Sequence, residues 1–194
     1  GRLDIEAARN FASAAEAAGV EQIVYLGGLV PEDASSEHIV SRRETGDVLR
    51  HGTVPVIELR AGIIVGPGSA AFEVMRDLVY HLPAMLTPRW VRSRSSPIAL
   101  ENLMEYLLRV PHMDQTAGHC YDVGGPEVLS YEDIMRQYAD VVGKHPVIIT
   151  VPVLSPRLSS YWLHLVTSVP APVAGALIEG LKQDVIADDT QIRQ

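Results

Sequence analysis

The sequence is poor in cysteine, because Cys120 is the only one among its 194 residues. A single thiol excludes an internal disulfide framework and is typical of a reducing compartment, so we expect a cytoplasmic protein. The seven histidines show no metal-ligand spacing, and no second pair completes a site around His112, His119 and Cys120. We therefore expect no resident metal, and we expect Cys120 to pack as a small hydrophobic residue.

Positive charge is also scarce: 16 Lys and Arg stand against 24 Asp and Glu, which gives a formal net charge of -8. An acidic chain disfavours nucleic acid and anionic membranes as general partners. The first residues are charged and show no secretory signal pattern. Apolar residues make up 47% of the chain, which is enough for a sizeable core. These features predict a globular protein with a small-molecule partner, and they leave homo-oligomerisation open.

Helical and strand patterns alternate along the chain. Helices are expected at residues 4–18, 37–50, 69–81, 101–110 and 130–142, and strands at residues 22–26, 54–65, 98–100, 120–123 and 147–151. Ser130 and Asp133 form a capping-box pattern at the start of the last helix. Residues 82–97, which are rich in proline and arginine, are expected to form a loop. The alternation predicts an α/β fold with a parallel sheet, whose ligands bind beyond the carboxyl ends of the strands.

Glycines follow three of the expected strands, at Gly27-Gly28, Gly62 and Gly124-Gly125. If the strands are parallel, these glycines border one crevice, where a ligand can approach the backbone closely. The alternative is that the turns between strands and helices require glycine by themselves.

A glycine-rich loop between a first strand and a first helix is absent, because the helix pattern at residues 4–18 comes first. In a doubly wound fold that loop holds a pyrophosphate. Either the chain is the back portion of a longer protein, or it does not hold a dinucleotide in the usual way. Residues 66–71 formally match G-x-G-x-x-A, but no strand ending in an acidic residue follows, so we expect a plain turn there.

Several segments resemble the extended and atypical short-chain dehydrogenase/reductase superfamily. They are AGVEQIVYLGGL at residues 18–29, VPVIELRAGIIVGPG at residues 54–68, and YDVGGP at residues 121–126, followed by LSYEDI at residues 129–134. The segments PRWV at residues 88–91 and VLSPRLSSYW at residues 153–162 resemble its NmrA-like, NAD(P)H-binding subgroup. The superfamily also includes nucleoside-diphosphate-sugar epimerases.

The resemblance implies a partial Rossmann-like doubly wound parallel sheet, formed by residues 1–68 and 97–126. A small α+β C-terminal substrate lobe would comprise residues 69–96 and 127–194. The implied cofactor is NAD or NADP, and the implied reaction is hydride transfer on a small organic substrate. The implied cofactor contacts are Leu26, Gly27, Gly28, Arg42, Ala61, Gly62, Ile63 and Ile64. Binding by this portion alone is expected to be weak, because the helix N-terminus that meets the pyrophosphate is lacking.

The sequence departs from the superfamily at the catalytic helix. Where catalytic members have Tyr-x-x-x-Lys, this chain has His38-x-x-x-Arg42, and the position of the catalytic serine falls near Gly27 or Gly28. His38 could act as a general acid or base, and Arg42 could bind a ribose hydroxyl or phosphate. The alternative is a solvated helix face that happens to contain both residues.

Two further segments are candidates for substrate or partner contacts. Arg89, Trp90, Arg92 and Arg94 form a basic cluster that could hold an anionic substrate, or could simply balance the acidic remainder of the chain. Residues 161–178 contain no Asp, Glu, Lys or Arg, but Pro170 and Pro172 interrupt them, so two short helices are expected rather than a membrane span. An interfacial or partner-docking helix is the other interpretation.

The lead hypothesis is an NAD(P)(H)-binding oxidoreductase of the atypical short-chain dehydrogenase class. A non-catalytic NAD(P)H sensor or scaffold is the first alternative, because the catalytic Tyr, Lys and Ser are replaced. A membrane-associated accessory protein that docks through residues 155–181 is the second.

Overall fold

A computed structural model describes residues 2–31, 37–113, 118–151 and 180–193, with the backbone alone at residues 37–39. The chain divides into two units. Unit 1 consists of Gly1–Gly62, Ile98–Gly124 and Ala187–Gln194, and unit 2 consists of Ile63–Pro97 and Gly125–Ile186.

Unit 1 is built around three parallel strands in the order β1-β2-β7, which are β1 (Ile23–Gly28), β2 (Val56–Ala61) and β7 (Cys120–Val123). The register places Tyr25 beside Glu58 and Gly28 beside Ala61. The central strand is buried on both faces, as the almost continuous apolar pattern of a parallel strand predicts, because Ile57 is 0% and the adjacent Val56 2% exposed. The predicted parallel α/β sheet is therefore confirmed.

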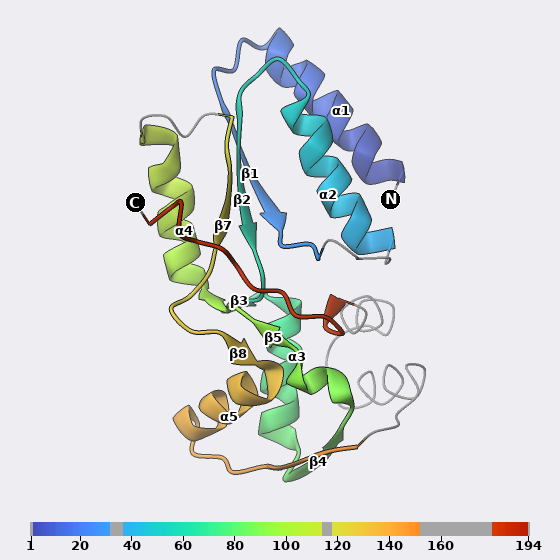
Figure 1. Ribbon diagram of the computed structural model, residues 1–194, viewed down its shortest axis with the longest axis vertical. Coiled ribbons are helices and arrows are strands. Elements are labelled where there is room, and N and C mark those ends of the chain that lie inside the picture. The colour runs from blue at the N-terminus through green and yellow to red at the C-terminus, as the bar shows by residue number, and fades with distance from the viewer. Residues whose placement is uncertain (1, 32–36, 114–117, 152–179, 194) are drawn as a thin grey trace. The chain divides into compact units, whose positions relative to one another are not determined.

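Helices cover both faces of this sheet (Figure 1). Helices α1 (Arg2–Ala17) and α2 (Glu37–Arg50) lie on one side, and α4 (Leu100–Arg109) lies on the other. The short strand β6 (Ile98–Ala99) precedes α4, and the 3-10 turn η2 (Val110–His112) follows it. Helix α1 presents small residues to the core, where the buried side chains are Ala8, Ala15, Ile23, Leu49, Val54 and Val56.

Unit 2 packs two helices, α3 (Ala70–His81) and α5 (Tyr131–Val141), around an apolar core that includes Val79, Val91 and Met135. Ser69 caps the first of these helices and Ser130 the second, and Asp133 completes the predicted capping box. The strands are β3 (Ile64–Val65), β4 (Ala84–Thr87), β5 (Arg94–Ser95), β8 (Leu129–Ser130) and β9 (Val147–Thr150). Strands β4 and β9 pair in parallel, whereas β5 and β8 pair antiparallel.

Two expectations about local structure are wrong. Residues 82–97 are not a loop, because they contain β4, the 3-10 helix η1 (Arg89–Arg92) and β5. Their prolines lie between these elements, at positions 83, 88 and 97, so they separate the elements without preventing them. The expected strand at residues 54–65 is also divided, because it breaks after Ala61 and resumes as β3.

The expected pair of short helices at residues 161–178 lies outside the described residues. Of the expected docking segment at residues 155–181, the structure describes only residues 180 and 181. Among the helices that the structure describes, none has the length and apolar composition needed to span a bilayer.

Candidate functional site

The carboxyl ends of β1, β2 and β7 meet at one edge of the sheet in unit 1. The register brings Gly27 beside Arg60, Gly28 beside Ala61, and Arg60 beside Asp122. Two glycines, an alanine and the oppositely charged side chains of Arg60 and Asp122 therefore border this edge. Parallel α/β sheets bind their ligands at this edge, so it is the first place to look for a site.

Arg42 of α2 extends over the end of β1. Its Nη1 lies 3.5 Å, and its Cδ 3.7 Å, from the position that a Cβ on residue 28 would occupy. Arg42 is exposed and forms no hydrogen bond or ion pair with the part of the chain that the structure describes. An unpaired guanidinium with its fork of donors is suited to phosphate oxygens or ribose hydroxyls.

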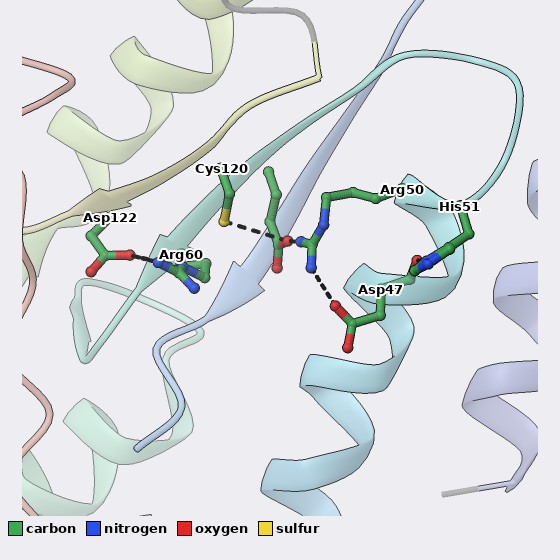
Figure 2. A network of polar contacts seen from close by, with 7 residues as sticks. Asp47, Arg50, His51, Arg60, Cys120 and Asp122 are labelled. Atoms are coloured by element: carbon green, nitrogen blue, oxygen red, sulfur yellow. Dashed lines mark hydrogen bonds and ion pairs between the residues drawn. The ribbon is translucent and has the colours of Figure 1, made fainter. Parts of the chain in front are cut away.

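Arg60, by contrast, is already engaged across the sheet (Figure 2). Its Nε donates to Asp122 Oδ1 at 2.8 Å, and its Nη2 lies 2.6 Å from the same oxygen. The second oxygen of Asp122 accepts a hydrogen bond at 3.1 Å from the backbone N–H of Asp188, in the C-terminal segment of unit 1. Asp122 thus ties β2, β7 and that segment together, which leaves Arg42 as the better candidate to bind a ligand.

A buried polar network lies below the edge, and Glu58 of β2 is its centre, with 3% of the residue exposed. Its carboxylate forms an ion pair with Arg50 of α2, which also pairs with Asp47. Figure 2 shows Arg50 reaching from its helix toward Cys120 and Asp47. The Cys120 thiol donates to Glu58 Oε2 at 3.5 Å.

Cys120 therefore does more than pack as a small hydrophobic residue. Burial raises the pKa of its thiol, and the nearby Arg60 and Arg50 only partly oppose this effect. A thiol with a raised pKa remains protonated at neutral pH, so Cys120 is a hydrogen-bond donor and a poor nucleophile.

Tyr25 is a candidate that the sequence did not indicate. Its ring edge lies 3.3 Å from the position that a Cβ on residue 27 would occupy. Burial raises the pKa of its hydroxyl, Arg42 opposes that effect, and Asp4 adds to it. The hydroxyl is therefore protonated at neutral pH and can donate a hydrogen bond near Arg42.

Unit 1 brings together part of the predicted cofactor site. Leu26, Gly27 and Gly28 end β1, Ala61 ends β2, and Gly62 follows it. Arg42 joins this group from α2, and the backbone of His38 lies one helical turn before it. The side chain of His38 lies outside the described residues, and Ile63 and Ile64 belong to unit 2.

The predicted basic cluster lies in η1 of unit 2, where Arg89 and Arg92 are exposed. Trp90 is half-buried and packs edge-on against Tyr131, with 6.3 Å between ring centroids. Burial raises the pKa of Tyr131 to about 12. Arg94 is held by Asp184, through its backbone N–H at 2.7 Å and its Nε at 2.9 Å. Arg94 is exposed as well but is engaged by Asp184, so Arg89 and Arg92 are the better candidates of this cluster to bind a ligand.

Sequence reasoning missed Glu58, Arg60 and Asp122 as site residues. The signal was present, because charged residues interrupt the apolar run Val56-Ile57-Glu58-Leu59-Arg60. A charge in a central strand requires a partner. Within the described residues, no group of three or more His, Cys, Asp or Glu side chains is placed to hold a metal ion.

Neither a model of a known protein family nor the sequence of a curated protein matches the chain. Solved structures do. Triphenylmethane reductase of Citrobacter sp. in complex with NADP(H) is 20% identical, with a TM-score of 0.73 over 97% of this chain and 65% of that one. The NADPH-dependent quinone oxidoreductase of Escherichia coli is 18% identical, with a TM-score of 0.75 over 95% of this chain and 65% of that one.

The chain has a Rossmann-like fold. A third similar structure, the Bordetella bronchiseptica enzyme WbmG in complex with NAD, is 17% identical, with a TM-score of 0.61 over 94% of this chain and 67% of that one. Identities this low establish the fold alone, and at that level they confirm the resemblance that the sequence indicated. The chain spans about 65% of the length of the two enzymes described first.

Proposed function

We propose that the protein is an NAD(P)(H)-binding oxidoreductase of the atypical short-chain dehydrogenase class, which acts on a small organic substrate. The observation that carries this proposal is the guanidinium of Arg42 beside Gly28, at the carboxyl edge of a parallel sheet, where it has no ion-pair partner among the described residues. Two of the similar structures are complexes with NADP(H) or NAD, which supports the same cofactor class here.

The cofactor contacts in unit 1 would be residues 26–28, 61 and 62, together with Arg42. Residue 28 has no side chain, so both the guanidinium and a ligand can approach the backbone of β1. Arg42 would donate hydrogen bonds to a ribose hydroxyl or a phosphate oxygen, as a fixed cation that cannot relay a proton. The nicotinamide would supply the hydride chemistry.

Proton transfer would fall to His38, because histidine can donate and accept a proton near neutral pH. Its backbone lies on the same helix as Arg42, one turn earlier. Arg89, Trp90 and Arg92 would hold the substrate on unit 2. The exposed guanidinium groups of Arg89 and Arg92 favour a substrate with an anionic or carbonyl oxygen.

The proposal is tested by titrating the full-length protein with NADPH and NADH and following nucleotide fluorescence. Arg42→Ala should weaken binding about tenfold to a hundredfold, since a charge-assisted hydrogen bond contributes roughly 1.5–3 kcal/mol. Arg43→Ala is the matched control, because Arg43 is also exposed on α2. Equal affinities of the two variants would remove Arg42 from the site.

Catalysis is tested separately from binding. NADPH oxidation should be measured against a panel of carbonyl compounds and quinones, with His38→Ala as the variant. Turnover that His38→Ala abolishes supports an enzyme. Tight nucleotide binding without turnover on the panel would instead indicate the sensor, an interpretation that the replaced Tyr-x-x-x-Lys motif favours.

A further inference from the structure

Helix α2 faces the sheet with a stripe of three residues at four-residue spacing. Arg42 lies against Gly28, Gly46 lies against the carboxylate of Glu58, and Arg50 forms an ion pair with that carboxylate. Residues four apart share one helix face, so these three contacts lie in a line along α2. The proposed ligand contact is therefore at one end of a row whose other end is anchored inside unit 1.

The space for the Glu58 carboxylate exists because two elements omit a side chain. A Cβ on residue 46 would lie 2.6 Å from Glu58 Oε1 and 2.9 Å from Oε2, and a Cβ on residue 27 would lie 2.6 Å from Oε1. Glycine is unfavourable in the interior of a helix relative to alanine. Gly46 is therefore best explained by the carboxylate that it accommodates.

Stability alone does not explain such an arrangement. Removing a carboxylate from water is unfavourable, and apolar residues of similar volume often replace a buried ion pair without loss of stability. Helix α2 contributes Leu49 and Val48 to a core in which α1 presents only alanines, and Ser41 of α2 donates to Asp4 of α1 at 3.0 Å. Contacts with alanines constrain the position of a helix along its axis less than polar contacts do. Alanines offer few side chains that could interlock with α2, whereas the ion pair between Arg50 and Glu58 requires a particular position of the helix.

We propose that Glu58 is a positioning residue, which with Arg50 fixes the axial position of α2 and so places Arg42 at Gly28. A helix rises about 1.5 Å per residue and about 5.4 Å per turn, so even a small slip would remove Arg42 from the edge of the sheet. Cys120 supports the carboxylate from β7, and Asp47 holds the other side of Arg50. The inference rests on the proposed function only in that Arg42 contacts the nucleotide.

The position of the helix can be measured without any ligand. Spin labels are attached at Arg43→Cys in α2 and Asn102→Cys in α4, which are both exposed sites of unit 1. A Cys120→Ser background removes the native thiol and keeps a donor to Glu58. The double variant Glu58→Met/Arg50→Met then replaces the ion pair by apolar side chains that preserve a filled interior.

The expected result is a narrow distance distribution in the reference protein and a broadened or shifted one in the double variant, with an unchanged or higher melting temperature. Glu58→Gln, which keeps the shape of the side chain, provides a second variant and should broaden the distribution less. An unchanged narrow distribution in the folded double variant would overturn the proposal.

A binding cycle tests whether the effect passes through Arg42. Glu58→Met/Arg50→Met should weaken NADPH binding about tenfold when Arg42 is present, and should add no loss in the Arg42→Ala protein. Fully additive losses would overturn the positioning role. If no variant and no reference protein binds NADPH or NADH, the proposed function fails, while the spin-label distances still decide whether Glu58 positions α2.

Discussion

The two units differ in the kind of side chain that they bury. In unit 1, a carboxylate at the centre of the sheet is matched by Arg50 and Cys120 from other elements. In unit 2, the region between α3 and α5 is filled by apolar and aromatic side chains, such as Met135 and the edge-on pair Phe72 and Tyr138 with centroids 5.6 Å apart. We expect the charge pairing of unit 1 to tolerate the loss of one partner poorly, whereas the apolar core of unit 2 should tolerate substitutions that keep its volume.

The largest expected effect is the loss of one partner of the buried pair in unit 1. Arg50→Ala should lower the free energy of unfolding by about 3–5 kcal/mol, because the carboxylate of Glu58, which is 3% exposed, would lose its charge partner inside unit 1. Urea denaturation measures this change. Glu58→Met/Arg50→Met is the control, and it should recover most of the loss. A single variant as stable as the wild type would show that the pair does not matter.

In unit 2 the comparable test is a substitution that creates a cavity in the apolar core. Met135 is 1% exposed, and Met135→Ala should cost about 2–4 kcal/mol through lost burial and incomplete collapse of the core. Val141, on the same helix and 84% exposed, provides a matched control that should change stability by less than about 0.5 kcal/mol. Similar losses for both variants would contradict the apolar core described for this unit.

A smaller effect is expected from filling the space at Gly46. Alanine is the better helix former, yet Gly46→Ala should destabilise unit 1 by about 1–2 kcal/mol, because its Cβ would lie 2.6 Å from the Glu58 carboxylate. In a Glu58→Ala background the same change should be neutral or stabilising. Thermal denaturation of the four proteins measures this coupling, and additive effects would refute it.

The smallest expected effect concerns the exposed ion pair of unit 2. Hydrogen bonds from the backbone and side chain of Arg94 lower the pKa of Asp184 below its ordinary value of 3.8. The folded state therefore binds this proton less readily than the unfolded state, so the contribution to stability is present above about pH 4 and disappears as the pH falls through the lowered pKa. Asp184→Asn should flatten the dependence of the melting temperature on pH between about pH 5 and pH 2.

A control for the last prediction is Asp140→Asn, because Asp140 is exposed and its nearest charged partner, His145, lies at 4.0 Å. That variant should leave the pH dependence of the melting temperature close to that of the wild type. A slope that Asp184→Asn does not alter would mean that the contact with Arg94 has no measurable effect on stability.

Much of unit 1 could be predicted, because its elements are defined by local patterns. Helix α2 and strand β7 begin and end at the residues that periodicity indicated, and the glycines at the end of β1 lie at the carboxyl edge of the sheet. Arg42 could be proposed as a site residue because the resemblance matches it to the lysine of Tyr-x-x-x-Lys. In unit 2, residues 82–97 could not be predicted, because two- and four-residue strands are too short to show a period.

The partners of the buried charges could not be derived from the sequence. Glu58 and Cys120 are 62 positions apart, as are Arg60 and Asp122, and their pairing depends on β7 lying next to β2. Arg50 and Arg60 are engaged through those pairings, whereas Arg42 has no ion-pair partner among the described residues.

By itself, the sequence determined that strands and helices alternate, that the sheet is parallel, and that glycines end its strands, because backbone hydrogen bonding and burial impose periods that are local along the chain. Only the tertiary structure decided that Glu58 is enclosed between two glycines, that Arg60 is engaged by Asp122, and that Arg42 lies against Gly28 at the edge of the sheet with no ion-pair partner among the described residues. The physical reason is that charge pairing and close packing depend on distances in space, which neighbouring residues in the sequence do not specify.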